Sequence, residues 1–215
     1  MIPVSEIFTS IDGEINPFGH GVSIFLRVHK CNLSCNWCDT VVKEYKMMEI
    51  NEIVEHIKSY GNIKKITITG GEPLLYKEEI SKLIFKLHGE NILKISIETN
   101  GTQSLFKYRG VSHIVDYKLP SSGCEHAMDL NIYETFSNAL DYVKFCIMDK
   151  HDYKRACEVA LKLQTDYEIY GSRIAFSPIF EANNSSIKKD LAKWMIEDQL
   201  PYKYNLQIHK IIGLR

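Results

Sequence analysis

Residues 31–40, CNLSCNWCDT, carry three cysteines on one short stretch, at Cys31, Cys35 and Cys38. This spacing lets three thiolates converge on one metal centre. A closed structural zinc site has four ligands, and a four-iron cluster is normally held by four cysteines. Three thiolates would therefore leave one position open for chemistry. A zinc knuckle completed by His29 or a distant cysteine, and three unrelated thiols, are the alternatives that spacing leaves open.

Around this stretch, short apolar runs alternate with amphipathic ones. Branched and aromatic side chains predict strands at 22–29, 65–69, 94–99, 113–119, 142–148, 173–179 and 204–212. Apolar residues at helical spacing predict helices at 49–60, 78–88, 152–164 and 186–196. Residues 5–20 are rich in glycine, asparagine and proline, which predicts a loop.

The alternation of strands and helices predicts an α/β fold with right-handed crossovers and a parallel sheet. Six or seven strands are too few for a closed eight-stranded barrel. We therefore expect an open, partial (β/α)6-type barrel with few helices. Because no linker, repeat or low-complexity segment interrupts the chain, we expect residues 1–215 to form a single domain.

Composition narrows the class of protein. The chain has 215 residues, is 45% hydrophobic and 25% charged, and carries a net charge of −1. These values predict a folded protein without the basic field that nucleic-acid binding needs. No apolar run approaches the ~20 residues of a membrane span, and the first residues lack signal-peptide character. We therefore expect a cytoplasmic protein with reduced cysteines, with Cys124, Cys146 and Cys157 as buried or idle thiols.

Polar residues follow the predicted strands. Gly70, Gly71 and Glu72 follow 65–69, and Asn100 follows 94–99. Asp116 and Ser177 lie near the ends of two later strands. Ligands of parallel α/β proteins collect at these carboxyl ends, although loops are polar in any protein. Two adjacent glycines further predict a close main-chain approach to a ligand.

The CxxxCxxC stretch and the downstream GGEP at 70–73 together resemble the radical S-adenosylmethionine superfamily. The resemblance implies that Cys31, Cys35 and Cys38 hold a 4Fe–4S cluster. S-adenosylmethionine would chelate the fourth iron, with GGEP near its methionine amine. The implied fold is the same trimmed barrel.

Within that superfamily, the chain resembles the 7-carboxy-7-deazaguanine synthase family over nearly its whole length. The likeness lies in CNLSCNWCDT, the upstream IDGE with Arg27, and the later GGEP, ETNG and PSSG. It implies Mg²⁺ at Thr40. The implied substrate-binding residues are Asp12, Gly13, Glu14, Arg27, Thr69 and Arg215. The implied S-adenosylmethionine-binding residues are Trp37, Cys38, Asp39, Gly71, Asp116, Tyr117, Lys118 and Ser177.

The implied reaction is a radical ring contraction of 6-carboxy-5,6,7,8-tetrahydropterin to 7-carboxy-7-deazaguanine, with loss of ammonia, in queuosine and deazapurine biosynthesis. It needs a one-electron donor such as a flavodoxin or ferredoxin, and the expected assembly is a homodimer. One departure is that Asp12 and Ile15 replace the family's usual Gln and Gly. A carboxylate at Asp12 accepts hydrogen bonds but cannot donate one. A glycyl-radical activating enzyme and a non-catalytic zinc module remain the alternative functions.

Overall fold

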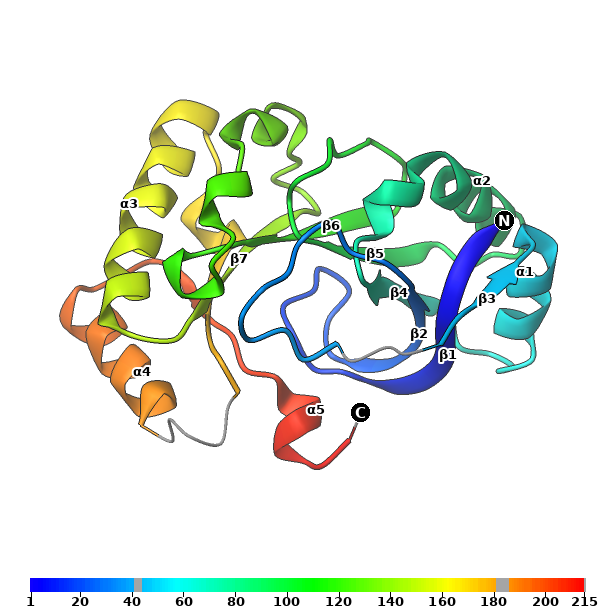
Figure 1. Cartoon of the computed structure of the whole chain (residues 1–215), viewed down its shortest axis with the longest axis horizontal. Coiled ribbons are helices and arrows are strands. Elements are labelled where there is room, and N and C mark those ends of the chain that lie inside the picture. Colours follow the sequence, from blue (N-terminus) through cyan, green and yellow to red (C-terminus); the bar gives the residue numbers. More distant parts are fainter. Residues whose placement is uncertain (41–43, 181–185, 215) are drawn as a thin grey trace.

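A computed structural model describes residues 1–40, 44–180 and 186–214. Within these residues one sheet has the strand order β3-β1-β2-β4-β5-β6-β7-β8-β9 (Figure 1). Along the sheet, each neighbouring pair in the row β2-β4-β5-β6-β7-β8-β9 is parallel. Strand β1 pairs antiparallel with both β2 and β3. The strands are β1 Ile2–Asp12, β2 Gly21–Val28, β3 Lys46–Met48, β4 Lys65–Gly70, β5 Lys94–Thr99, β6 Val111–Tyr117, β7 Tyr142–Ile147, β8 Ile174–Pro178 and β9 Lys203–Tyr204.

Helices cover the outside of the curved sheet, with α1 and α2 on one side of the view and α3 and α4 on the other (Figure 1). They are α1 Ile50–Lys58, α2 Lys77–Gly89, α3 Lys150–Tyr167, α4 Ile187–Glu197 and the short α5 Ile208–Ile211. Short 3₁₀ helices lie at Pro73–Tyr76, Pro120–Ser122, Glu125–Ala127, Leu130–Thr135 and Gly171–Arg173. The mostly parallel, open sheet with few helices confirms the predicted partial barrel.

Side-chain alternation along the strands separates the core from the inside of the barrel. On β4, Ile66 and Ile68 are fully buried in the apolar core. The intervening Thr67 and Thr69 carry polar contacts inside the barrel, to Asp12 and Glu98 respectively. The core formed with the helices thus leaves the opposite face of the strands available for polar groups.

Two predictions for the ends of the chain are wrong. Residues 5–20 were expected to be a loop, but residues 2–12 form β1, because they pair with β2 from Val4–Val28 to Asp12–Gly21. The turn-forming residues begin only at the end of that strand. Residues 204–212 were expected to be a strand, but β9 ends at Tyr204 and the chain then forms α5. This short helix packs against the end of β1, where Ile208 N–H donates to Gly13 O at 3.4 Å.

The described residues contain no helix that is both long enough and apolar enough to cross a membrane.

Candidate active site

A cavity of about 400 Å³ lies at the carboxyl ends of the parallel strands. Most of the predicted site residues line it, although they come from distant parts of the chain. These are Asp12, Glu14, Arg27, Cys31, Cys35, Trp37, Cys38, Asp39, Thr40, Thr69, Gly71, Asp116, Lys118 and Ser177. Polar residues at strand ends therefore meet in one pocket, as the fold class requires.

Two predicted site residues are placed differently, and a third lies outside the described residues. Gly13 does not line the cavity; a Cβ added there would lie 2.8 Å from Cβ of Ile208 in α5. Tyr117 is 6% exposed and packs against Phe145 in the core, because its neighbours Asp116 and Lys118 take the inward positions of the strand end. Arg215 lies outside the described residues.

The cysteine loop is anchored on the turn at Pro120–Ser122. Asn36 donates from its main-chain N–H to Ser122 O and from Nδ2 to Ser121 O, both at 3.0 Å. Trp37 Nε1 donates to Ser121 Oγ at 3.1 Å. Cys31 and Cys38 are exposed and Cys35 is half-buried. The three thiols line one cavity, and hydrogen bonds to Ser121 and Ser122 fix the loop that carries them.

The GGEP stretch packs against the same loop. Gly71 N–H donates to Val28 O at 3.0 Å, and Glu72 N–H donates to Lys30 O at 2.8 Å. A Cβ at Gly71 would lie 1.8 Å from Lys30 O. The close approach expected of these glycines is therefore made to the main chain that enters the cysteine loop. The fully buried Glu72 carboxylate accepts from Leu74 N, Thr99 Oγ1 and Asn100 N, which ties GGEP to the end of β5.

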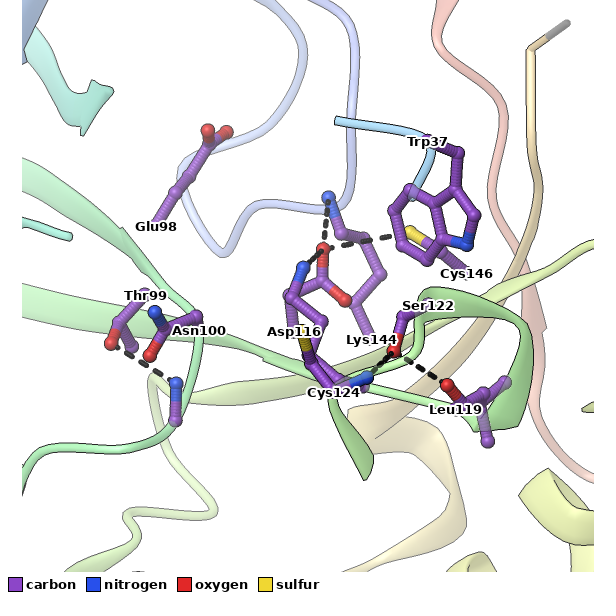
Figure 2. A network of polar contacts seen from close by, with 12 residues as sticks. Trp37, Glu98, Thr99, Asn100, Asp116, Leu119, Ser122, Cys124, Lys144 and Cys146 are labelled. Atoms are coloured by element: carbon purple, nitrogen blue, oxygen red, sulfur yellow. Dashed lines mark hydrogen bonds and ion pairs between the residues drawn. The ribbon is translucent and has the colours of Figure 1, made fainter. Parts of the chain in front are cut away.

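Four charged groups in the same cavity form a largely buried network. Lys144 Nζ lies 2.8 Å from Glu14 Oε2 and 3.8 Å from Asp116 Oδ2, which also lies 3.1 Å from Lys118 Nζ (Figure 2). Burial raises the pKa of the Glu14 carboxyl, but the charge of Lys144 outweighs it and lowers the pKa to about 2. Burial lowers the pKa of Lys144, and Glu14 raises it well above its ordinary value. Both groups are therefore charged at neutral pH.

Asp12 forms a second buried ion pair beside this network. Its Oδ2 lies 3.0 Å from Lys65 Nζ and accepts from Asn16 Nδ2 at 2.7 Å and from Thr67 Oγ1 at 2.9 Å. All three partners contact the Oδ2 atom of Asp12, and Asp12 lines the cavity. Lys65 balances the charge that Asp12 introduces in place of a glutamine.

Glu98 differs from the other carboxyl groups of the pocket. Thr69 Oγ1 donates to its Oε2 at 2.7 Å, and Figure 2 shows Glu98 standing apart from the Asp116 network. Burial, followed by repulsion from the Glu14 charge, raises the pKa of Glu98 to about 7. A carboxyl group with this pKa can gain or lose a proton near neutral pH.

Arg27 and Thr40 lie at another part of the cavity. Arg27 Nε pairs with Glu6 Oε1 at 2.6 Å, and its Nη1 lies 3.4 Å from Thr40 Oγ1. Asp39 pairs with Lys210. Burial raises the pKa of the Asp39 carboxyl, but the hydrogen bond and charge of Lys210 produce a net lowering.

Sequence reasoning missed several residues that line the cavity. Lys144 and Cys146 alternate along β7, and this polar alternation within an apolar strand was the available signal. Cys146 was expected in the core, but it lines the cavity and its thiol donates to Asp116 Oδ2 at 3.5 Å (Figure 2). Cys124 is buried as predicted and lies beside Cys35, where it adds to the upward shift that burial gives to the pKa of the Cys35 thiol.

Known proteins support one family. Residues 26–117 match the family model described as the radical SAM superfamily. A 7-carboxy-7-deazaguanine synthase from Clostridium acetobutylicum is 35% identical, covering 97% of this chain and 95% of that protein. A second, from Methanospirillum hungatei, is 34% identical, covering 98% of this chain and 85% of that protein.

A solved structure supports the fold independently. The crystal structure of QueE from Escherichia coli superimposes with a TM-score of 0.74 at 23% identity, covering 96% of this chain and 93% of that one. At this identity the likeness concerns the fold. The relatives favour neither the glycyl-radical activating enzyme nor the zinc module.

Proposed function

Because the chain belongs to the 7-carboxy-7-deazaguanine synthase family of radical S-adenosylmethionine enzymes, we propose that it converts 6-carboxy-5,6,7,8-tetrahydropterin to 7-carboxy-7-deazaguanine with loss of ammonia. This is a carbon–nitrogen lyase reaction, and its product would enter queuosine or deazapurine biosynthesis. The observation that carries the proposal is the 35% identity over 97% of the chain. The pocket supports it, because three thiols and a set of buried charges face the same cavity.

The residues present fit an iron–sulfur cluster. Cys31, Cys35 and Cys38 line one cavity, and Leu33 N–H donates to Cys31 Sγ at 3.4 Å, as suits a thiolate. We propose that these three cysteines hold a 4Fe–4S cluster with one open iron. When bound, the cluster and S-adenosylmethionine supply the radical chemistry that starts the reaction. The chain itself binds and orients the substrate and the cofactor, and it excludes water from the site.

We propose that S-adenosylmethionine lies beside the cysteine loop. Trp37, Asp39, Gly71 and Ser177 line the same cavity as the three cysteines. Lys118 Nζ lies 5.1 Å from the centre of the Trp37 ring and pairs with Asp116. This arrangement offers an aromatic face and both signs of charge to a zwitterionic ligand. Tyr117 can contribute only main-chain atoms, since its side chain is in the core.

We propose that the pterin lies against the charged network. Asp12 and Glu14 present carboxylates that can accept from the ring N–H and amino groups of a pterin. Lys144 keeps the Glu14 carboxylate ionised inside the protein, and Lys65 forms an ion pair with Asp12. Arg27 would pair with the substrate carboxylate through its guanidinium, while Thr69 and Glu98 would face the ring. The proposed contact to the terminal carboxylate of Arg215 concerns a residue outside the described ones.

We propose Mg²⁺ at Thr40. A hydroxyl is a hard oxygen ligand, and Mg²⁺ keeps several ligands from substrate and water. Arg27 Nη1 lies near this hydroxyl, so a substrate carboxylate could contact both the guanidinium and the ion. Activity should rise with added Mg²⁺, and Thr40→Ala should lose product while retaining the cluster. Equal activity in chelator and in millimolar Mg²⁺ would remove this role.

The exposed Cys31 and Cys38 would place the cluster near the surface, within reach of an external electron donor. We propose a flavodoxin or ferredoxin as that donor. A homodimer and a cytoplasmic location stay predictions.

One experiment tests the function directly. The anaerobically reconstituted protein is incubated with S-adenosylmethionine, a reductant and the carboxy-tetrahydropterin, and the deazaguanine is sought by mass spectrometry. We expect the product mass, together with released ammonia, only when all three are present. Cleavage of S-adenosylmethionine without any deazaguanine would contradict the synthase while leaving the radical enzyme in place.

A further inference from the structure

Asn100 connects the end of β5 to the cysteine loop. Its Nδ2 lies 3.5 Å from Cys31 Sγ and donates to Asn32 Oδ1 at 3.0 Å. Asn100 is 7% exposed and also lines the cavity, and Figure 2 shows it next to Thr99 at the end of its strand. A buried amide nitrogen is thus directed at the sulfur of a proposed cluster ligand.

The direction of this amide is fixed by its other end. Asn100 Oδ1 accepts from Thr102 N at 3.0 Å and from Thr102 Oγ1 at 2.7 Å. Because two donors occupy the oxygen, the nitrogen must face the sulfur. The main chain is fixed as well, since Asn100 N–H donates to Glu72 Oε2 at 2.7 Å. The GGEP glutamate therefore positions the asparagine, and the asparagine positions a donor on Cys31.

We propose that Asn100 is a positioning residue that tunes the cluster, by donating an N–H···S hydrogen bond to the Cys31 thiolate. Hydrogen bonds to the sulfurs of an iron–sulfur cluster are among the factors that set its reduction potential. A donor stabilises the more negative, reduced state, so it makes the cluster easier to reduce. Leu33 N–H also donates to Cys31 Sγ, but only the Asn100 donor can be removed by changing a side chain.

This inference rests on the cluster of the proposed function, but not on its pterin chemistry. The test is a redox titration of the reconstituted protein, without pterin, in which electron paramagnetic resonance follows cluster reduction. Asn100→Ser and Asn100→Asp both keep an oxygen that can accept from Thr102 N–H, so they preserve the turn while losing the donor. We expect Asn100→Ser to make reduction about tenfold less favourable, which lowers the midpoint potential by about 59 mV. Asn100→Asp should lower it further, because it adds a negative charge.

Asn32→Ser is the matched control. Asn32 is exposed, belongs to the same network and bonds the same amide nitrogen, but its side chain has no contact with the sulfur among the described interactions. The midpoint potential of the cluster in the Asn32→Ser variant should equal that in the wild type. Iron and sulfide content and thermal unfolding are measured on every protein.

Three outcomes would overturn the inference. The first is an unchanged potential in both Asn100 variants with a full cluster. The second is failure of both variants to assemble a cluster, which would make Asn100 an assembly residue, and the third is loss of folding. A wild-type protein that holds no cluster would instead contradict the proposed function, so the two failures are distinguishable.

Discussion

The two sides of the pocket are built in opposite ways. The cysteine side consists of Cys31–Thr40 with the GGEP and ETN loops, and hydrogen bonds in which at least one partner is a main-chain group hold its parts together. The charged side consists of Asp12, Glu14, Asp116, Lys118 and Lys144. Apart from the pair Asp116–Lys118, its ion pairs join side chains from different elements of the chain. The first side can be recognised from three short stretches of sequence, whereas the ion pairs of the second form only when the sheet is assembled.

This difference has an energetic consequence. Removing a thiol from an exposed loop deletes a ligand without leaving a buried charge behind. Removing one partner of a buried ion pair leaves the other charge uncompensated, which costs about 3–5 kcal/mol. The cysteine side should therefore fail in function with little loss of stability, and the charged side should fail in both.

The largest expected effect is on the cysteine side. Replacing Cys31, Cys35 or Cys38 with Ala should remove the iron–sulfur chromophore and all cleavage of S-adenosylmethionine, because the cluster loses one of three ligands. Iron and sulfide analysis with visible absorption measures this. Cys157→Ala, on α3, is the control and should keep both. If Cys124→Ala, beside Cys35, also loses the cluster, the model of three ligands and one open iron is wrong.

The second effect concerns the charged side. Lys144→Met should destabilise the protein by about 3–5 kcal/mol, because Glu14 then remains buried without its cation. Unfolding by denaturant under anaerobic conditions measures the change. The double variant Lys144→Met with Glu14→Gln should recover much of the loss, since no lone charge remains. Equal destabilisation in the single and double variants would show that packing, rather than charge pairing, is what Lys144 contributes.

The third effect is pH-dependent and arises from Glu98. Its pKa is about 7 in the folded protein and 4.5 in the reference state, so the folded state binds more protons between these values. Stability should therefore fall as pH rises through that window, by at most about 1.4 kcal/mol per pH unit. Glu98→Gln should flatten the profile there and be the more stable protein at pH 8. Parallel wild-type and Glu98→Gln profiles from pH 4.5 to 8 would contradict the raised pKa.

The same contrast explains what the sequence could predict. The cysteine loop, GGEP and the parallel strands were recognisable because their signals are local: spacing, paired glycines and alternation. Lys144 and Lys65 were missed because the sequence around a strand lysine does not show which carboxylate it will pair with. Their partners are Glu14, in the loop after β1, and Asp12, at the end of β1. The composition of residues 5–20 predicts a loop because turn-forming residues fill the second half of that stretch, whereas the pairing of its first half with β2 is a tertiary feature.

The smallest expected effect tests Arg27, which lines the cavity near Thr40. Its Nε is paired with Glu6, its guanidinium lies 5.7 Å from the centre of the Phe8 ring, and its Nη1 reaches Thr40. A lysine keeps the charge but cannot form two parallel hydrogen bonds to a carboxylate. Arg27→Lys should therefore weaken pterin binding about tenfold, or about 1.4 kcal/mol, with cluster content and pterin-independent cleavage of S-adenosylmethionine unchanged.

Glu6→Gln separates binding from positioning in that experiment. This variant keeps the guanidinium and removes the anion that orients it, so a smaller loss of pterin affinity is expected than for Arg27→Lys. Affinity is measured by titrating the pterin into reconstituted protein and following the rate of product formation. An equal loss in both variants would mean that the ion pair with Glu6, rather than a bidentate contact, is what the pocket requires. Wild-type affinity in Arg27→Lys would leave Arg27 with only a structural role at the end of β2. The substrate would then bind a lysine ammonium as well as it binds a guanidinium that donates two parallel hydrogen bonds.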